Sequence, residues 1–427
     1  MLAAVIAAAV VPAAIWKPVA GSTAALSADD AAADDSRPWL GAAARALSVD
    51  ERVELLAATM TQPEKVAQLL SAHVDEDTAE IVASYSQLGF GVACLPARHS
   101  PNNATHQLNW RNELQQSIMG SSRLGIPVSF RGELLHSGAV AGTTVFPMPC
   151  LLGAAWNRSL ARAVASAAAA EATAGGIDYG FGPVLQVATD ARWGRVNEAY
   201  AEDPTLVTEL GLAAVEGFQG APGSTGEYIR DEAKLPMQAK HFAMYGQISH
   251  DTLPVDVSLT TLHDVYLRPF RAFVTRGGGR AVMASHPPIR YVPAVANRWL
   301  LTNLLRREWG PEGTNVTTAS DCGDVGALCR RDGSDPAKPG SRDAPGANWG
   351  VAASKQAAAE LALTAGLDQE LDIGMSSFNF PLLSNATSAD VVSNRFEPRF
   401  LNYSRIFLAE SVKEKRGKLT EAGPGPQ

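Results

Sequence analysis

The chain has 427 residues, of which 46% are hydrophobic, so it is long and apolar enough to bury a large core. Its 36 lysines and arginines against 44 aspartates and glutamates give a formal charge of −8, and the absence of a concentrated basic stripe argues against nucleic acid as a partner. There is no Cys-x-x-Cys pair and no His/Cys cluster with zinc spacing, so the sequence supports neither a metal site nor a cofactor.

The first 47 residues are predicted to be a signal-like, Ala-rich leader. Residues 2–15 form an apolar run that is too short to span a bilayer, and small residues follow at 20–25, as at a cleavable signal. Five Asn-x-Ser/Thr sequons would accept glycans only in a secretory lumen, namely Asn103, Asn157, Asn315, Asn385 and Asn402. We therefore expect a secreted or secretory-lumen glycoprotein with no membrane span in the mature chain. The alternative is a disordered Ala-rich leader.

One folded domain is predicted from residue 48 to residue 411. It begins with two capping boxes, Ser48 with Glu51 and Thr61 with Glu64, each of which marks a helix start. Strand-like apolar runs follow at 126–130, 176–181, 237–240, 280–284, 315–319 and 363–367, and helical patterns at 157–173, 204–218, 261–275 and 297–309. This alternation predicts an α/β fold, either a parallel sheet or a (β/α)8 TIM-type barrel. The Gly/Pro-rich segment 330–348 is expected to be a surface loop, and 412–427 a disordered tail.

Polar residues gather where predicted strands end. Glu133 and His136 follow the first of these strands, Lys240 and His241 end another, and Asp321 follows a third. Because the chemistry of such barrels takes place where strands end and βα loops begin, we expect these side chains to converge on one face.

A series of motifs occurs in a fixed order along the chain. It comprises Arg123-Leu-Gly-Ile-Pro127, Glu133-Leu-Leu-His136, Val145-Phe-Pro147, Phe181-Gly-Pro-Val184, Asp190-Ala-Arg-Trp-Gly-Arg195, Glu202-Asp-Pro204, Lys240-His-Phe242, Val282-Met283 and Ser320-Asp321. The series covers about residues 50–375 and resembles glycoside hydrolase family 3, most closely its xylosidase- and arabinosidase-like members. The resemblance implies an N-terminal (β/α)8 barrel and an exo-acting enzyme that hydrolyses terminal β-linked sugars with retention.

Asp321 is implied as the catalytic nucleophile, because it aligns with the family's Ser-Asp pair at the end of a predicted strand. Hydrolysis with retention needs a carboxylate that attacks the anomeric carbon and a second carboxyl group, about 5–5.5 Å away, that protonates the leaving oxygen. The alternative role for Asp321 is to cap the next helix. Gly313 precedes Asp321 by eight residues, where family members usually have about five, and a shift of strand register here would turn the carboxylate away.

Three further residues are implied to bind the sugar. Lys240 and His241 resemble the family's Lys-His pair, which donates hydrogen bonds to sugar hydroxyls. Since adjacent strand residues face opposite ways, we expect both to lie beyond the strand end. Arg195 resembles the family's sugar-binding arginine, whose planar fork can hold two vicinal oxygens, and Arg192 is the alternative donor.

Glu133 and Cys322 favour a pentose substrate. Glu133 stands where glucosidase-like members carry an aspartate that grips two hydroxyls and xylosidase-like members carry a glutamate in a Glu-x-Leu-His segment. The longer side chain suits a pentose, which lacks the exocyclic hydroxymethyl group. Cys322 follows Ser-Asp where many glucosidase-like members have tryptophan. The resemblance therefore favours β-xylosides or arabinosides over β-glucosides. His136 would either orient Glu133 or belong to the core.

Two departures from the family pattern concern the nucleophile and its partner acid. After Val-Met the family usually shows Ser-Tyr-Asn, with the tyrosine supporting the nucleophile, whereas this chain has Ser285-His286-Pro287, with Tyr291 downstream. Either Tyr291 or His286 would take that place. The family's acid/base comes from a histidine loop after Lys-His-Phe, which is absent here, or from a second α/β sandwich domain. Too few residues follow Gly374 for such a domain, so we expect a barrel without it and assign no acid/base.

Other functions stay open at this point. General acid catalysis contributes about 10²- to 10⁴-fold in rate. A chain without the acid/base would therefore be a truncated or catalytically weak barrel that binds carbohydrate. In this hypothesis, as for the hydrolase, the partner is an oligosaccharide or a small glycoside. An unrelated barrel enzyme, such as an aldolase with Lys240 as its Schiff base, is a further hypothesis.

Overall fold

The computed structural model describes residues 37, 39, 47–74, 87–89, 91–94, 104–222, 233–247, 256–310, 316–329, 349–372 and 379–385. The predictions for most of the leader, for the loop at 330–348, for the tail at 412–427 and for the sequons at 103, 315 and 402 lie outside these residues. The domain limits therefore stay predictions, as does glycosylation.

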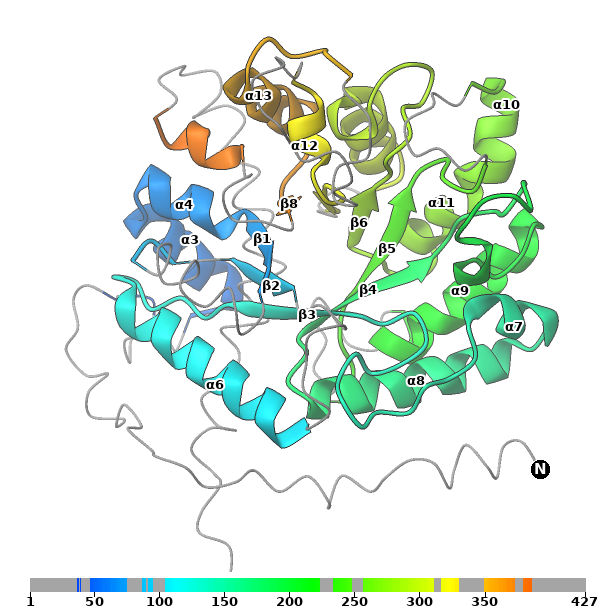
Figure 1. The fold of residues 1–427 in the computed structure, drawn as a ribbon, viewed down its shortest axis with the longest axis horizontal. Helices are drawn as coiled ribbons and strands as arrows, with labels where there is room; N and C mark the ends of the chain where they lie inside the picture. Colours follow the sequence, from blue (N-terminus) through cyan, green and yellow to red (C-terminus); the bar gives the residue numbers. More distant parts are fainter. Residues whose placement is uncertain are drawn as a thin grey trace, which may run out of the picture.

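Eight parallel strands form a nearly closed barrel, which confirms the predicted fold class (Figure 1). The strands are β1 Leu70–His73, β2 Val92–Cys94, β3 Ser129–Glu133, β4 Tyr179–Val184, β5 Met237–Phe242, β6 Ala281–Ala284, β7 Thr317–Ala319 and β8 Glu370–Asp372. They pair in the order β7-β6-β5-β4-β3-β2-β1-β8. A single parallel bridge, between Ala319 and Gln369, joins the two end strands, so one seam of the barrel is paired less completely than the others.

Helices lie outside the strands in Figure 1. The α-helices are α3 Val49–Thr59, α4 Gln62–Gln68, α6 Ala104–Ser121, α7 Pro149–Ala154, α8 Arg158–Ala174, α9 Pro204–Gln219, α10 Leu259–Thr261, α11 Arg268–Thr275, α12 Asp324–Ala327 and α13 Lys355–Ala365; the π-helices are η5 Leu262–Tyr266 and η7 Trp299–Glu308, and the 3-10 turns are η4 Val196–Glu198, η6 Ala294–Ala296 and η8 Phe380–Asn385. Both capping boxes are confirmed, and they start α3 and α4. None of the helices described is both long and apolar enough to cross a bilayer.

Local signals explain most of these boundaries. Asn157 caps α8 by accepting a hydrogen bond from the amide of Leu160, and Asp203 caps α9 by accepting from Leu206. Pro204 is the first residue of α9, where its missing N–H costs nothing. The helices expected at 157–173 and 204–218 are confirmed to within one residue at each end.

The strand predicted at 363–367 is wrong. These residues end helix α13 and lead out of it, and the last strand is β8. Leu363 and Ala365 of this run are buried on the inner face of the helix, and Leu367 is buried just beyond it. The helix predicted at 261–275 is interrupted by the π-helix η5. Strands β1 and β2, of four and three residues, were not predicted.

Helices α8 and α9 pack closely through small residues. The buried face of α8 consists of Ala161, Val164, Ala165, Ala168, Ala169 and Ala172. Opposite it, a Cβ added at Gly217 of α9 would lie 2.4 Å from the carbonyl oxygen of Arg162. Glycine at this position therefore lets the backbones of the two helices meet.

Candidate active site

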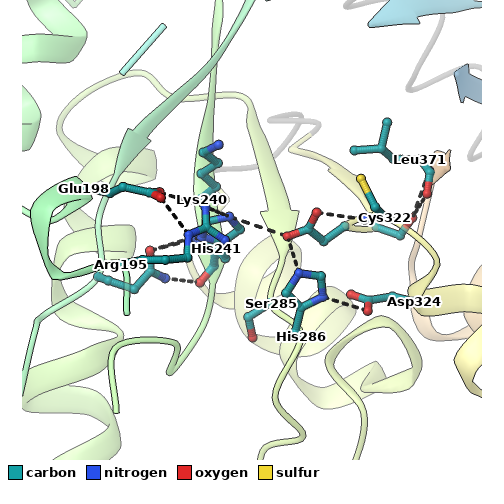
Figure 2. A network of polar contacts seen from close by, with 12 residues as sticks. Arg195, Glu198, Lys240, His241, Ser285, His286, Cys322, Asp324 and Leu371 are labelled. Carbon is teal, nitrogen blue, oxygen red and sulfur yellow. Dashed lines mark hydrogen bonds and ion pairs between the residues drawn. The ribbon is translucent and has the colours of Figure 1, made fainter. Parts of the chain in front are cut away.

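The carboxyl ends of four strands of the barrel, three of them adjacent, present the predicted site residues. Glu133 ends β3, Lys240 and His241 lie near the end of β5, His286 follows β6 and Asp321 follows β7. Figure 2 shows how Lys240, His241 and His286 lie among the other polar groups. Residues far apart in the chain are thus brought to one end of the barrel, as expected.

Asp321 is held by donors on both of its carboxylate oxygens. The amide of Cys322 donates to Oδ1 at 2.7 Å, and His286 Nε2 lies 2.9 Å from Oδ2. Strand β7 pairs with β6 from Thr317 to Ala319 without a shift of register. The carboxylate is 12% exposed, so it faces the end of the barrel and retains access to a ligand.

His286 joins two carboxylates. Its Nδ1 lies 2.9 Å from Oδ1 of Asp324, while its Nε2 faces Asp321. Because a carboxylate only accepts, both ring nitrogens must donate, and only the imidazolium has two N–H groups. Burial by itself disfavours this charge, but the charges of Asp321 and Asp324 outweigh burial and raise the pKa of His286 well above its ordinary value.

The same interactions keep Asp321 ionised. Burial by itself would raise the pKa of Asp321, but the charge and hydrogen bond of His286, with a smaller effect of the charge of Arg195, hold that pKa well below its ordinary value. Asp321 is therefore a buried carboxylate that remains charged at neutral pH.

His241 has the opposite protonation state. Its Nδ1 is 3.4 Å from Oε1 of Gln186, which only accepts, while its Nε2 is 3.3 Å from Nη2 of Arg195, which only donates. The ring is therefore neutral, with its proton on Nδ1. Burial first, and then the charge of Arg195, lower the pKa of His241 well below its ordinary value. Consequently the 3.5 Å approach between His241 and Asp321 is not an ion pair.

Arg195 is fixed by Glu198 in a fork. Its Nε and Nη2 donate to the two oxygens of Glu198 at 2.8 and 2.7 Å, and its guanidinium lies 5.3 Å from the ring centre of Tyr245. Although burial opposes it, pairing with Glu198 raises the pKa of Arg195. Arg192, the alternative donor, pairs with Asp190 and is 76% exposed. The site thus contains Arg195 and not Arg192.

Lys240 and Glu133 form an ion pair across two strands. Nζ of Lys240 lies 2.7 Å from Oε1 and 2.6 Å from Oε2 of Glu133. Lys240 is buried, whereas the side chain of Glu133 is 40% exposed. Contrary to our expectation, Lys240 and His241 lie within β5 and not beyond it.

Two other predicted residues lie apart from this group. Tyr291 is 73% exposed in a tight turn between Ile289 and Val292, and no contact in the described part of the chain joins it to Asp321. His136 binds the carbonyl oxygen of Phe146 at 3.0 Å and makes no described contact with Glu133.

The sequence did not reveal three residues that shape the site, namely Asp324, Glu198 and Gln186. Asp324 follows Asp321 by three residues. In one tight turn, this spacing places the two side chains on the same side. Glu198 follows Arg195 at the same spacing. Gln186 clamps the backbone of His241 by accepting from its amide at 2.9 Å and by donating to its carbonyl oxygen. Of these three residues, only Asp324 and Glu198 could have been found from the sequence, through their spacing of three residues from Asp321 and Arg195.

Comparisons with known proteins place this site in a family context. The profile of the glycosyl hydrolase family 3 N terminal domain matches residues 61–379. A beta-xylosidase of Formosa agariphila is 37% identical over 70% of this chain and 39% of its own length, and a periplasmic beta-glucosidase of Salmonella typhimurium is 29% identical over 70% and 33%. The chain thus spans less than half the length of these relatives.

Solved structures show the same barrel. The structure of a β-glucosidase from Erythrobacter marinus superposes with a TM-score of 0.71 at 30% identity and covers 88% of this chain and 46% of its own. A β-glucosidase from Listeria innocua in complex with gluconolactone superposes with a TM-score of 0.69 at 27% identity, over 87% of this chain and 48% of its own.

Proposed function

The chain belongs to glycosyl hydrolase family 3, and on this basis we propose that it is the barrel of a retaining exo-acting β-glycosidase with Asp321 as its nucleophile. The observation that carries the proposal is the ionised, doubly held carboxylate of Asp321 at the carboxyl end of the barrel. Two cationic side chains of the same end of the barrel, Lys240 and Arg195, can donate their remaining N–H groups to sugar hydroxyls.

In the reaction, an oxygen of Asp321 attacks the anomeric carbon, and the bond to the leaving oxygen breaks. The resulting glycosyl ester is then hydrolysed by water, which returns the carboxylate. The leaving oxygen needs a proton from an acid. Glu133 is tied to Lys240 and Glu198 to Arg195, so we assign that role to neither.

We further propose terminal β-xylosides or arabinosides as substrates in preference to β-glucosides. Both carboxylate oxygens of Glu133 accept from Nζ of Lys240, and the Glu133 side chain is 40% exposed, so the carboxylate takes up space beside Lys240. A pentose has no exocyclic hydroxymethyl group to fit into this space. The names of two relatives, a beta-xylosidase and a putative beta-xylosidase at 37% and 31% identity, agree with this preference.

The test uses a leaving group that needs no acid. Dinitrophenyl β-xyloside releases an acidic phenol, so its cleavage tests the nucleophile alone. We expect a burst of phenol equal to the enzyme concentration and a xylosyl adduct on the peptide that contains Asp321. The variant Asp321→Asn should give neither, with a loss in rate of about 10³-fold or more.

The control variant Asp264→Asn removes an exposed carboxylate and should behave as wild type. If the wild-type protein forms no adduct while xylose still binds by calorimetry, the proposal fails and the second candidate, a binding barrel without turnover, is correct.

The structure does not favour the aldolase hypothesis. Lys240 holds both oxygens of a carboxylate, which does not suit a neutral Schiff-base lysine.

A further inference from the structure

We propose that His286, itself oriented by Asp324, is a positioning residue that holds the nucleophile Asp321 for attack. The proposal rests on the proposed function, because it assigns a role to a neighbour of the nucleophile. None of the relatives' names assigns such a role. Figure 2 shows a dashed line from His286 to Asp324. The other ring nitrogen of His286 lies 2.9 Å from Oδ2 of Asp321.

The geometry demands a charged ring. His286 has a carboxylate oxygen 2.9 Å from each of its nitrogens, so it satisfies both only as an imidazolium. Once the ring loses a proton, one of the two carboxylates faces a bare nitrogen. The carboxylate of Asp324 is wholly buried, whereas that of Asp321 is 12% exposed. We therefore expect the remaining proton to stay between His286 and Asp324, so that Asp321 loses its donor.

One turn presents both carboxylates to the ring. The amide of Asp324 donates to the carbonyl oxygen of Asp321 at 3.3 Å, and Gly323 between them has a φ of +76°. A glycine adopts this conformation without steric cost. His286 comes from the neighbouring strand end, and Ser285 before it donates to the carbonyl oxygen of Ala243. Imidazole and carboxylates are thus fixed from two sides.

The other groups that face His286 do not replace this charge. His241 stacks at 6.4 Å between ring centres and is neutral, and the ring of Tyr245 meets His286 edge-on at 5.8 Å. Arg195 is paired with Glu198. Asp321 and Asp324 are therefore the groups that keep His286 protonated, and Asp324 alone remains to do so when Asp321 becomes an ester.

This role has a consequence in both chemical steps. In the first step His286 fixes the carboxylate whose oxygen bonds to the anomeric carbon while the leaving oxygen departs with its electron pair. In the second step water bonds to that carbon, its proton passes to solvent, and the ester bond breaks with its electron pair returned to Asp321. The imidazolium, kept charged by Asp324, donates to the returning carboxylate.

Two variants separate charge from hydrogen bonding. Asp324→Asn keeps an acceptor for Nδ1 but removes the charge. His286→Gln keeps an N–H donor to Asp321 but no longer titrates. The readout is kcat/KM for dinitrophenyl β-xyloside as a function of pH, since the first step with this substrate does not depend on a general acid.

For wild type we expect an alkaline limb where His286 loses its proton. Asp324→Asn should lower kcat/KM about threefold at pH 6 and move this limb down by about one pH unit or more, because an adjacent opposite charge is worth about one to three pKa units. His286→Gln should lower kcat/KM about tenfold and abolish the limb. Asp264→Asn should superpose on wild type.

A purely structural role would lower the rate equally at every pH and leave the limb in place. The proposal is overturned if Asp324→Asn shows the wild-type limb, or if His286→Gln retains it. Should Asp324→Asn fail to fold, as judged by circular dichroism, the His286→Gln profile decides alone. A wild-type protein that forms no adduct on Asp321 overturns both proposals, whereas adduct formation with an unmoved limb overturns only this one.

Discussion

At the scale of single residues, a substitution of Glu133 gives the most direct test of the proposed preference for xylosides over glucosides. It is 40% exposed and is held in place by Lys240. The variant Glu133→Asp withdraws the carboxylate by one methylene and makes room for a hydroxymethyl group. We expect the ratio of kcat/KM for aryl β-glucoside to that for aryl β-xyloside to rise about tenfold, because one methylene in a pocket is worth about 1–3 kcal/mol.

The matched control is Glu209→Asp, which shortens a surface glutamate paired with Arg276 and Arg158. This variant should leave the ratio of the two substrates unchanged. An unchanged ratio in Glu133→Asp as well would mean that Glu133 does not select the sugar.

The sequence predicted a good part of the site at this scale, and the reason is the barrel itself. Residues in the last positions of a strand or just after it lie at its carboxyl end, so Lys240, His241 and Asp321 are brought to the same end of the barrel wherever their loops go. The same rule separates His286 from Tyr291. Strand β6 ends at Ala284, so His286 is two residues beyond it and faces the site, while Tyr291 lies in the next turn, which points to solvent.

At the scale of elements, helix positions were predicted better than strand positions. Caps such as Asn157 and Asp203 are local signals that the sequence carries in full. Strands such as β1 and β2 take their identity from pairing with neighbours far along the chain, which three or four residues do not encode. The run at 363–367 was misread because a buried helix face and a buried strand are equally apolar over so short a span.

The packing of α8 on α9 gives a prediction at this scale. In Gly217→Ala the new Cβ would meet the carbonyl oxygen of Arg162 at 2.4 Å, and the helices must move apart. We expect the free energy of unfolding in urea to fall by about 1–3 kcal/mol, as for other overpacked cores.

Gly120 of α6 provides the opposite case. A Cβ added there meets nothing within 4 Å, so Gly120→Ala should be neutral or raise the free energy of unfolding by up to about 1 kcal/mol through the better helix propensity of alanine. Equal effects of the two substitutions would contradict close contact between α8 and α9.

At the scale of the whole molecule, the seam between β7 and β8 decides how firmly the barrel closes. Backbone hydrogen bonds from Gln369 to Thr318 and from Ser320 to Gln369 form the one bridge between the end strands, and side chains add to this connection. Asp368, wholly buried, accepts a hydrogen bond from the amide of Thr318 at 2.8 Å and pairs with Arg306. Arg306 also donates to the carbonyl oxygens of Val316 and Gly366. This network joins the strand that carries Asp321 to the strand that closes the barrel.

Asp368→Asn should therefore open the seam. The substitution removes the buried carboxylate that pairs with Arg306, and breaking such a pair costs about 3–5 kcal/mol. We expect the unfolding midpoint in urea to fall accordingly, and amide hydrogen exchange to accelerate at 317–320 and 368–371 but not in α8 or α9. Asp264→Asn, which removes an exposed carboxylate, should change neither.

Because Asp321 directly follows β7, a loosened seam should also slow formation of the xylosyl adduct, even though Asp368 does not touch the site. If exchange at 317–320 stays at the wild-type rate, backbone pairing alone holds the seam and the network around Arg306 is not what closes the barrel.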